Sequence, residues 1–117
     1  MHADARKLPW DARRATDRAI HFARTKHFVE YPLDDLLRSA IERQLTIVGE
    51  ARNPLRQIDP ETAGVIPELA RVVGFRSVLV HGYASLDKRI VWGVIETNLP
   101  TLLTSLENLL AQPSRDS

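Results

Sequence analysis

Hydrophobic residues recur at three- and four-residue spacing along most of this chain, which is the periodicity of one face of an α-helix. The first such stretch begins at Trp10, directly after Pro9. Its apolar positions are Ala12, Ala15, Ala19, Phe22 and Ala23. Because most of these side chains are small, the pattern predicts a helix that packs closely against a neighbour.

The next stretch predicts the longest helix of the chain. It follows Pro32 and begins near Leu33 or Asp34, where an aspartate can cap the free amides of a helix start. The predicted inner stripe consists of Leu33, Leu36, Leu37, Ala40, Ile41, Gln44, Ile47, Val48 and Ala51. We expect this helix to end at Asn53-Pro54 and a loop to run from there to Glu61, because proline interrupts the helical hydrogen bonds.

Two further helices are predicted in the second half of the chain. Pro67 suits the first turn of a third helix, and Glu68 is favourable there because of the helix dipole. Ser85 and Asp87 can cap a fourth helix, which Pro100 is expected to kink. Its inner positions are Ile90, Val91, Val94 and Ile95 before the kink and Leu102, Leu103, Leu106, Leu109 and Leu110 after it. The pattern predicts an all-α, up-and-down bundle of four main helices.

The chain has 117 residues, which suits one domain with one core. We expect a flexible lead-in at 1–9, a helical domain at 10–111 and a flexible tail at 112–117. Sixteen basic and fifteen acidic side chains give a net charge of +1, so any contact with RNA must come from a local patch. No apolar run approaches the ~20 residues of a membrane span, and no signal peptide is evident. These features, together with the absence of cysteine, favour a soluble cytoplasmic protein.

The candidate chemistry lies between Gly74 and Tyr83. Within this stretch Arg76 offers a permanent cation, His81 a group that can exchange a proton near neutral pH, and Tyr83 a phenol. These residue types suit the binding and cleavage of phosphate esters. The structural alternative is a helix end at which the arginine reaches solvent, the histidine bonds a carbonyl and the tyrosine packs in the core.

The spacing of the two charged groups limits how they can act together. On a helix that turns about 100° per residue, His81 is rotated by roughly 140° from Arg76. One straight helix therefore cannot direct both at the same atom. Either the helix ends near Gly82, or a second subunit completes the site.

The order Arg76, four residues, His81, one residue, Tyr83 resembles the R-x4-H-x-Y signature of the HepT-like toxins, in the HEPN superfamily of helical ribonucleases. The flanking residues agree with that family: Asp87 and Val91-Trp92 follow the motif, and Ile47-Val48-Gly49-Glu50-Ala51 precedes it. The resemblance extends from about residue 11 to about residue 111. One position departs from the pattern, since Ser77 stands where the family usually has asparagine.

The resemblance implies a toxin of a toxin–antitoxin pair that cleaves cellular RNA as a homodimer without a metal or another cofactor. Arg76 would hold the phosphate and His81 would transfer protons, with Ser77 and Tyr83 in auxiliary roles. The partner would be a minimal nucleotidyltransferase antitoxin that attaches AMP to Tyr83. Glu50 and Asp87 could support the site from outside, although Glu50 also fits a surface or capping role. The alternative function is a non-catalytic module that binds a nucleotide or RNA beside a nucleotidyltransferase.

Overall fold

The computed structural model describes residues 6–58, 61 and 88–112, and these residues form helices without a strand. Helix α1 spans Lys7–Ala23 and α2 spans Asp35–Ile58. The last helical run consists of α5 (Lys88–Gly93), the π-helix η2 (Val94–Asn98) and α6 (Leu99–Ala111). The all-α prediction is confirmed for this part of the chain. The helix predicted from Pro67 lies outside the described residues, so the four-helix bundle stays a prediction.

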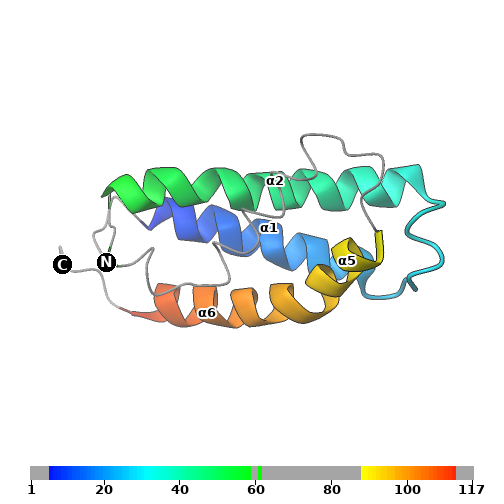
Figure 1. Ribbon diagram of the computed structural model, residues 1–117. Coiled ribbons are helices and arrows are strands. Elements are labelled where there is room, and N and C mark those ends of the chain that lie inside the picture. Colours follow the sequence, from blue (N-terminus) through cyan, green and yellow to red (C-terminus); the bar gives the residue numbers. More distant parts are fainter. Residues whose placement is uncertain (1–5, 59–60, 62–87, 113–117) are drawn as a thin grey trace.

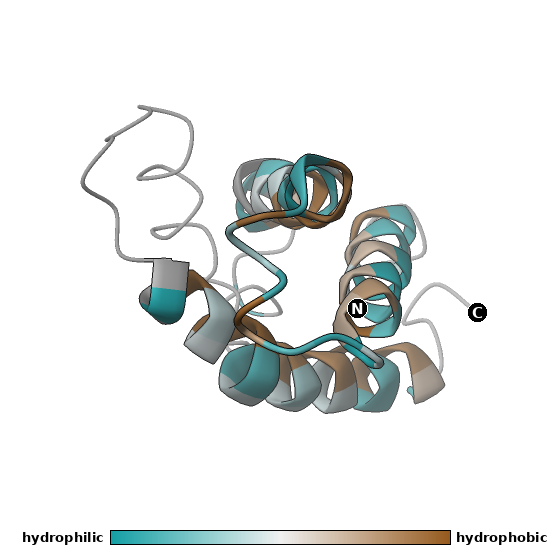
Figure 2. Ribbon diagram, turned by 90° about the vertical axis from the view of Figure 1, so that its right-hand side faces the viewer, coloured by the Kyte–Doolittle hydropathy of each residue, from teal (hydrophilic) through white to brown (hydrophobic). Residues whose placement is uncertain are grey.

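Helix α1 packs against both α2 and α6. It lies between them and runs antiparallel to each (Figure 1). Seen along the helices, the hydrophobic stripes of the three segments turn toward a shared interior (Figure 2). Hydrophobic burial thus joins segments from the two ends of the chain.

Helix α1 is held by its alanine face, as predicted. Ala12, Ala15, Ala19 and Ala23 are all buried. Between them lies the fully buried Thr16, whose hydroxyl donates to the carbonyl oxygen of Ala12 at 2.7 Å. Such small residues allow the backbones of neighbouring helices to come close together.

The start of α1 differs from the prediction. The helix begins at Lys7 instead of Trp10, and Pro9 is buried in its first turn. A proline is tolerated there because the first amides of a helix have no intrahelical partner. The sequence pattern does not reveal this turn, because a proline is also typical of a helix boundary.

Helix α2 begins as predicted but ends later. The Asp34 carboxylate accepts a hydrogen bond from the backbone N–H of Leu37 at 3.0 Å, which is N-cap geometry. The predicted end at Asn53-Pro54 is wrong, because Pro54 lies inside the helix. Leu55, which directly follows it, is only 1% exposed, and its burial favours continuation of the helix through the proline.

The inner stripe of α2 also differs at its first turn. The predicted burial of Leu33 and Leu36 is wrong, since these side chains are 85% and 81% exposed. The buried stripe instead begins at Leu37 and includes Leu45, which the prediction omitted. Leu36 lies about 100° around the helix from the buried Leu37, on a side that faces solvent.

The last helical run passes Pro100 without a break. The backbone N–H of Leu99 donates to the carbonyl oxygen of Val94, five residues earlier, so one wider turn precedes α6. Pro100 then lies in the first turn of α6. A π-helical turn thus directly precedes Pro100, and the predicted kink at this proline stays a prediction. Of the predicted inner positions, those buried are Val91, Ile95, Leu102, Leu106 and Leu109.

None of the helices within the described ranges combines the length and the hydrophobicity needed to cross a membrane.

Candidate functional site

The motif residues lie outside the part of the chain that the structure describes. This applies to Arg76, Ser77, His81, Tyr83 and Asp87 alike. What the structure places is the framework on either side of them. The end of α2 and the start of α5, which flank this segment, lie at opposite ends of the bundle (Figure 1).

The helix that follows the motif is anchored by aromatic packing. Trp92 of α5 is 6% exposed, and its ring lies 5.4 Å from that of Tyr31, centroid to centroid, with the planes inclined at 45°. The Arg89 guanidinium lies 5.5 Å from the centroid of the Phe28 ring. The connection between α1 and α2 thus holds α5, whose first residue comes five positions after Tyr83.

The phenol of Tyr31 is an unusual member of this cluster. Its oxygen is buried and has no hydrogen-bond partner among the described residues. Burial, and secondarily the charge of Glu42, raises the pKa of this phenol far above its ordinary value, while Arg38 acts in the opposite direction. Tyr31 therefore stays protonated and neutral, which suits a packing role.

Glu50 is the one predicted site residue that the structure describes. It lies on α2 and is exposed, whereas the preceding Val48 and Gly49 are buried. It takes part in an interaction within the protein. A supporting role for Glu50 at the active site stays a prediction.

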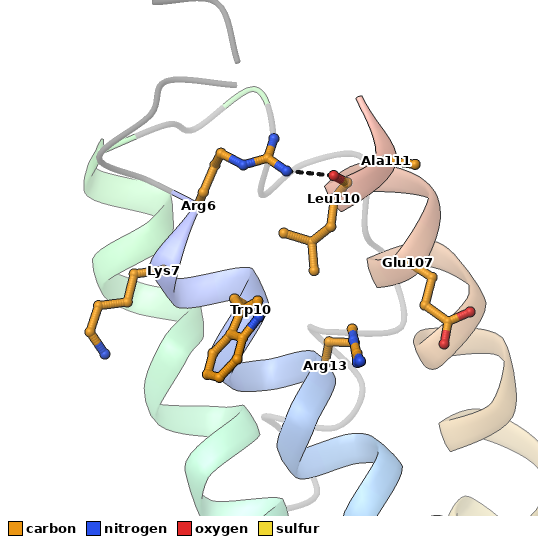
Figure 3. A pocket seen from close by; sticks show the side chains of 7 residues that line it. All are labelled: Arg6, Lys7, Trp10, Arg13, Glu107, Leu110 and Ala111. Atoms are coloured by element: carbon orange, nitrogen blue, oxygen red, sulfur yellow. Dashed lines mark hydrogen bonds between the residues drawn. The ribbon is translucent and has the colours of Figure 1, made fainter. Parts of the chain in front are cut away.

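A groove that was not predicted from the sequence opens between the start of α1 and the end of α6 (Figure 3). Its volume is about 530 Å³, and its lining consists of Arg6, Lys7, Trp10, Arg13, Glu107, Leu110 and Ala111. Three cationic side chains thus surround a tryptophan that is 50% exposed. The signal available in the sequence was a tryptophan among basic residues near the start of a helix.

Arg6 closes one end of this groove. Its guanidinium donates to the carbonyl oxygen of Gln112 at 2.8 Å and to that of Leu110. These carbonyls are at the C-terminus of α6, where the helix dipole favours a cation. Arg6 therefore links the two ends of the described chain, while Arg13 and Glu107 lie farther along the groove (Figure 3).

The described residues contain two histidines, one on α1 and one in the connection to α2. His21 and His27 are both exposed, and no group of three histidine or acidic side chains in the described residues is arranged to hold a metal ion.

Comparison with known proteins assigns the family. The family model "Ribonuclease HepT-like" matches residues 12–109, a range that covers most of the described helices and the positions from Arg76 to Tyr83. The chain therefore belongs to the HepT-like ribonuclease family.

Individual relatives agree with this assignment. "Probable ribonuclease HepT" of Thermococcus cleftensis is 30% identical over 105 residues, which cover 85% of this chain and 89% of the relative. "Putative RNase MJ1380" of Methanocaldococcus jannaschii is 24% identical over 89% of this chain and 94% of its own length. "Putative RNase TTE0752" of Caldanaerobacter subterraneus is 30% identical over 71% of this chain and 73% of its own. No solved structure gives a significant match.

Proposed function

We propose that this protein is the toxin of a toxin–antitoxin pair, a cytoplasmic endoribonuclease that cleaves cellular RNA as a homodimer without a metal. The observation that carries the proposal is the family match across residues 12–109, which spans the R-x4-H-x-Y motif. Two relatives that are named as ribonucleases, and that match this chain over most of their length, support the same activity. In the proposed fold, a helix from Pro67 completes a four-helix bundle and carries Arg76.

In the proposed mechanism His81 transfers the protons. Cleavage of RNA requires a base for the 2′-hydroxyl and an acid for the departing 5′-oxygen. An unperturbed histidine has a pKa of about 6.5, so one imidazole can be neutral and a second protonated near neutral pH. A dimer supplies two copies of His81, one for each task.

Arg76 holds the phosphate in this mechanism. The guanidinium presents paired N–H donors to two phosphate oxygens and offsets the negative charge that develops in the transition state. Because Arg76 and His81 differ by roughly 140° around a helix, the arginine of one subunit can act beside the histidine of the other. Ser77 contributes a hydroxyl to the same surface, and Glu50 and Asp87 orient the groups in contact with RNA.

Regulation acts on Tyr83. We propose that a minimal nucleotidyltransferase antitoxin transfers AMP to the phenol oxygen, which attacks the α-phosphate of ATP and releases pyrophosphate. The added phosphate places negative charge two residues from His81 and close to Arg76 in sequence. That charge would occupy the anion site and exclude RNA.

The test is incubation of the purified protein with total RNA in EDTA, beside its His81→Ala variant. The expected result is discrete RNA fragments that end in 2′,3′-cyclic phosphate and appear with the wild-type protein but not with His81→Ala. Fragments that appear only when a divalent metal is added would overturn the metal-free mechanism. Intact RNA in every lane, from protein that mass spectrometry shows to be free of AMP, would instead favour a non-catalytic binding module.

A further inference from the structure

The outer face of α1 is basic along its whole length. We define this face by its exposed side chains, including that of Arg24 directly after the helix, which are Lys7, Trp10, Arg14, Asp17, Arg18, His21 and Arg24. At about 100° per residue they centre roughly opposite the buried alanines of the same helix. The core therefore leaves this face directed to solvent.

The N-terminal segment that contains α1 is much more basic than the chain as a whole. Residues 6–26 contain seven arginine and lysine side chains and two aspartates, whereas the whole chain has a net charge of only +1. Asp11 pairs with Lys7 at 2.9 Å, and Asp17 lies on the outer face itself. Arg14 and Arg18 form no ion pair with another described residue. Their charges are thus available to a polyanion, and the sequence-based requirement for a local RNA-binding patch is met here.

Trp10 gives this surface an aromatic platform. Its side chain is 50% exposed, and the Arg14 guanidinium lies 5.6 Å from the centroid of its ring. A single exposed tryptophan is ordinary on a protein surface, but a tryptophan beside arginines is a combination that binds unpaired bases and their phosphates. The groove beside Trp10, with Arg13 in its wall, offers room for a nucleotide (Figure 3).

The other end of the same face lies next to α5 and η2. Arg24 and Lys26 line a hollow of about 390 Å³ together with Trp92 and Glu96. Trp92 belongs to the helix that directly follows the motif segment. The outer face of α1 therefore extends for roughly 25 Å, the length of a 17-residue helix, from the groove beside Trp10 to α5.

We propose that the outer face of α1 binds a single-stranded stretch of the RNA substrate away from the point of cleavage, with Trp10 stacking on a base and Arg14 and Arg18 binding phosphates. This inference rests on the proposed ribonuclease function and adds to it a surface that holds the substrate. It also predicts a preference for unpaired RNA, because a base in a duplex cannot reach Trp10.

The test measures binding of a fluorescein-labelled 12-nucleotide single-stranded RNA in EDTA, with every protein carrying His81→Ala so that the RNA stays intact. Arg14→Gln/Arg18→Gln should raise Kd about tenfold and reduce the slope of log K against log salt by about 1.4, or 0.7 for each lost phosphate contact. Arg43→Gln/Arg56→Gln is the matched control, because it removes two exposed arginines from α2. It should change Kd less than twofold.

Tryptophan emission tests the stacking contact. The protein contains two tryptophans, Trp10 and Trp92, and only Trp10 is exposed. RNA should quench the emission of the parent protein but not that of Trp10→Phe, and Trp10→Ala should weaken binding roughly tenfold.

Equal effects of the two double variants, or an emission that RNA does not quench, would overturn the inference. These measurements use intact RNA and do not depend on cleavage. If the wild-type protein does not cleave RNA, the proposed function is refuted separately. If the wild type does cleave RNA but the two double variants change Kd equally, only the role of α1 is refuted.

Discussion

The rings of Tyr31 and Trp92 pack against each other, with 5.4 Å between their centroids. Tyr31 belongs to the connection between α1 and α2, and Trp92 to the helix that follows the motif segment. The contact joins residues 61 positions apart in the sequence and fixes the helix that begins five residues after Tyr83. The N-terminal half of the chain thus positions the end of the segment that carries the proposed chemistry.

Tyr31→Phe should leave stability at neutral pH within about 0.5 kcal/mol of the wild type. The substitution keeps the ring against Trp92 and removes a buried hydroxyl that has no partner among the described residues. Urea unfolding followed by circular dichroism measures the change. Trp92→Ala is the comparison, and it should cost about 3–5 kcal/mol because it removes a large buried side chain. A loss of more than 1 kcal/mol in Tyr31→Phe would show that the hydroxyl is hydrogen-bonded.

The unfolding free energies of the wild type and Tyr31→Phe should differ at alkaline pH. Burial raises the pKa of the Tyr31 phenol in the folded protein above the value of about 10 in the unfolded chain, so the unfolded state loses this proton first. The stabilising contribution of the neutral phenol is fully present below pH 10 and decreases as pH rises beyond it, by up to about 1.4 kcal/mol per pH unit. Unfolding free energies from pH 8 to 11.5 should therefore decrease more steeply for the wild type than for Tyr31→Phe. Parallel curves would contradict the burial of a neutral phenol.

Two adjacent leucines should respond differently to truncation. Leu37 is 7% exposed and Leu36 is 81% exposed, so Leu37→Ala should cost about 2–3 kcal/mol and Leu36→Ala less than about 0.5 kcal/mol. Thermal and urea unfolding of the two variants provide the comparison, and each serves as the control for the other. A similar loss in both would mean that Leu36 is covered, for example by a second subunit, and unfolding at several protein concentrations would identify that case.

Asp34→Ala should destabilise the protein by about 1 kcal/mol. It removes the carboxylate that accepts a hydrogen bond from the Leu37 amide at the start of α2. Asp34→Asn, which keeps a side-chain oxygen, should restore most of the loss. Asp35→Ala is the control for charge, because Asp35 adds negative charge to the same first turn and pairs with Arg38 at the surface. An equal loss in both alanine variants would contradict a specific cap.

Arg76→Ala should weaken both the binding and the cleavage of RNA, whereas His81→Ala should abolish cleavage and leave binding largely intact. The reason is that the arginine holds the phosphate in both steps, but the histidine acts only in proton transfer. Binding is measured by fluorescence anisotropy and cleavage by gel analysis of one defined RNA. Arg43→Ala, on the exposed surface of α2, is the control. Normal cleavage by Arg76→Ala would exclude its proposed role.

Local signals in the sequence were sufficient for much of the fold. Helical periodicity identified the alanine face of α1 and the buried positions Val91 and Ile95, because a single buried face produces that pattern wherever the helix packs. The capping aspartate at position 34 was also predictable, since its hydrogen bond spans three residues. The motif and its flanks identified the family, which the comparison confirmed. The roles of Arg76, His81 and Tyr83 remain predictions.

The sequence by itself determined the helical class, the family and the residue types available for chemistry, because periodicity and motif spacing are properties of neighbouring positions. Only the tertiary structure decided how far each helix extends and which leucines are covered. Pro54 stays inside α2 although proline disfavours helix, because burial of Leu55 favours continuation. Leu36 is exposed because no described segment covers that side of α2. The groove beside Trp10 likewise requires the two ends of the chain to meet, and no pattern of neighbouring residues encodes that contact.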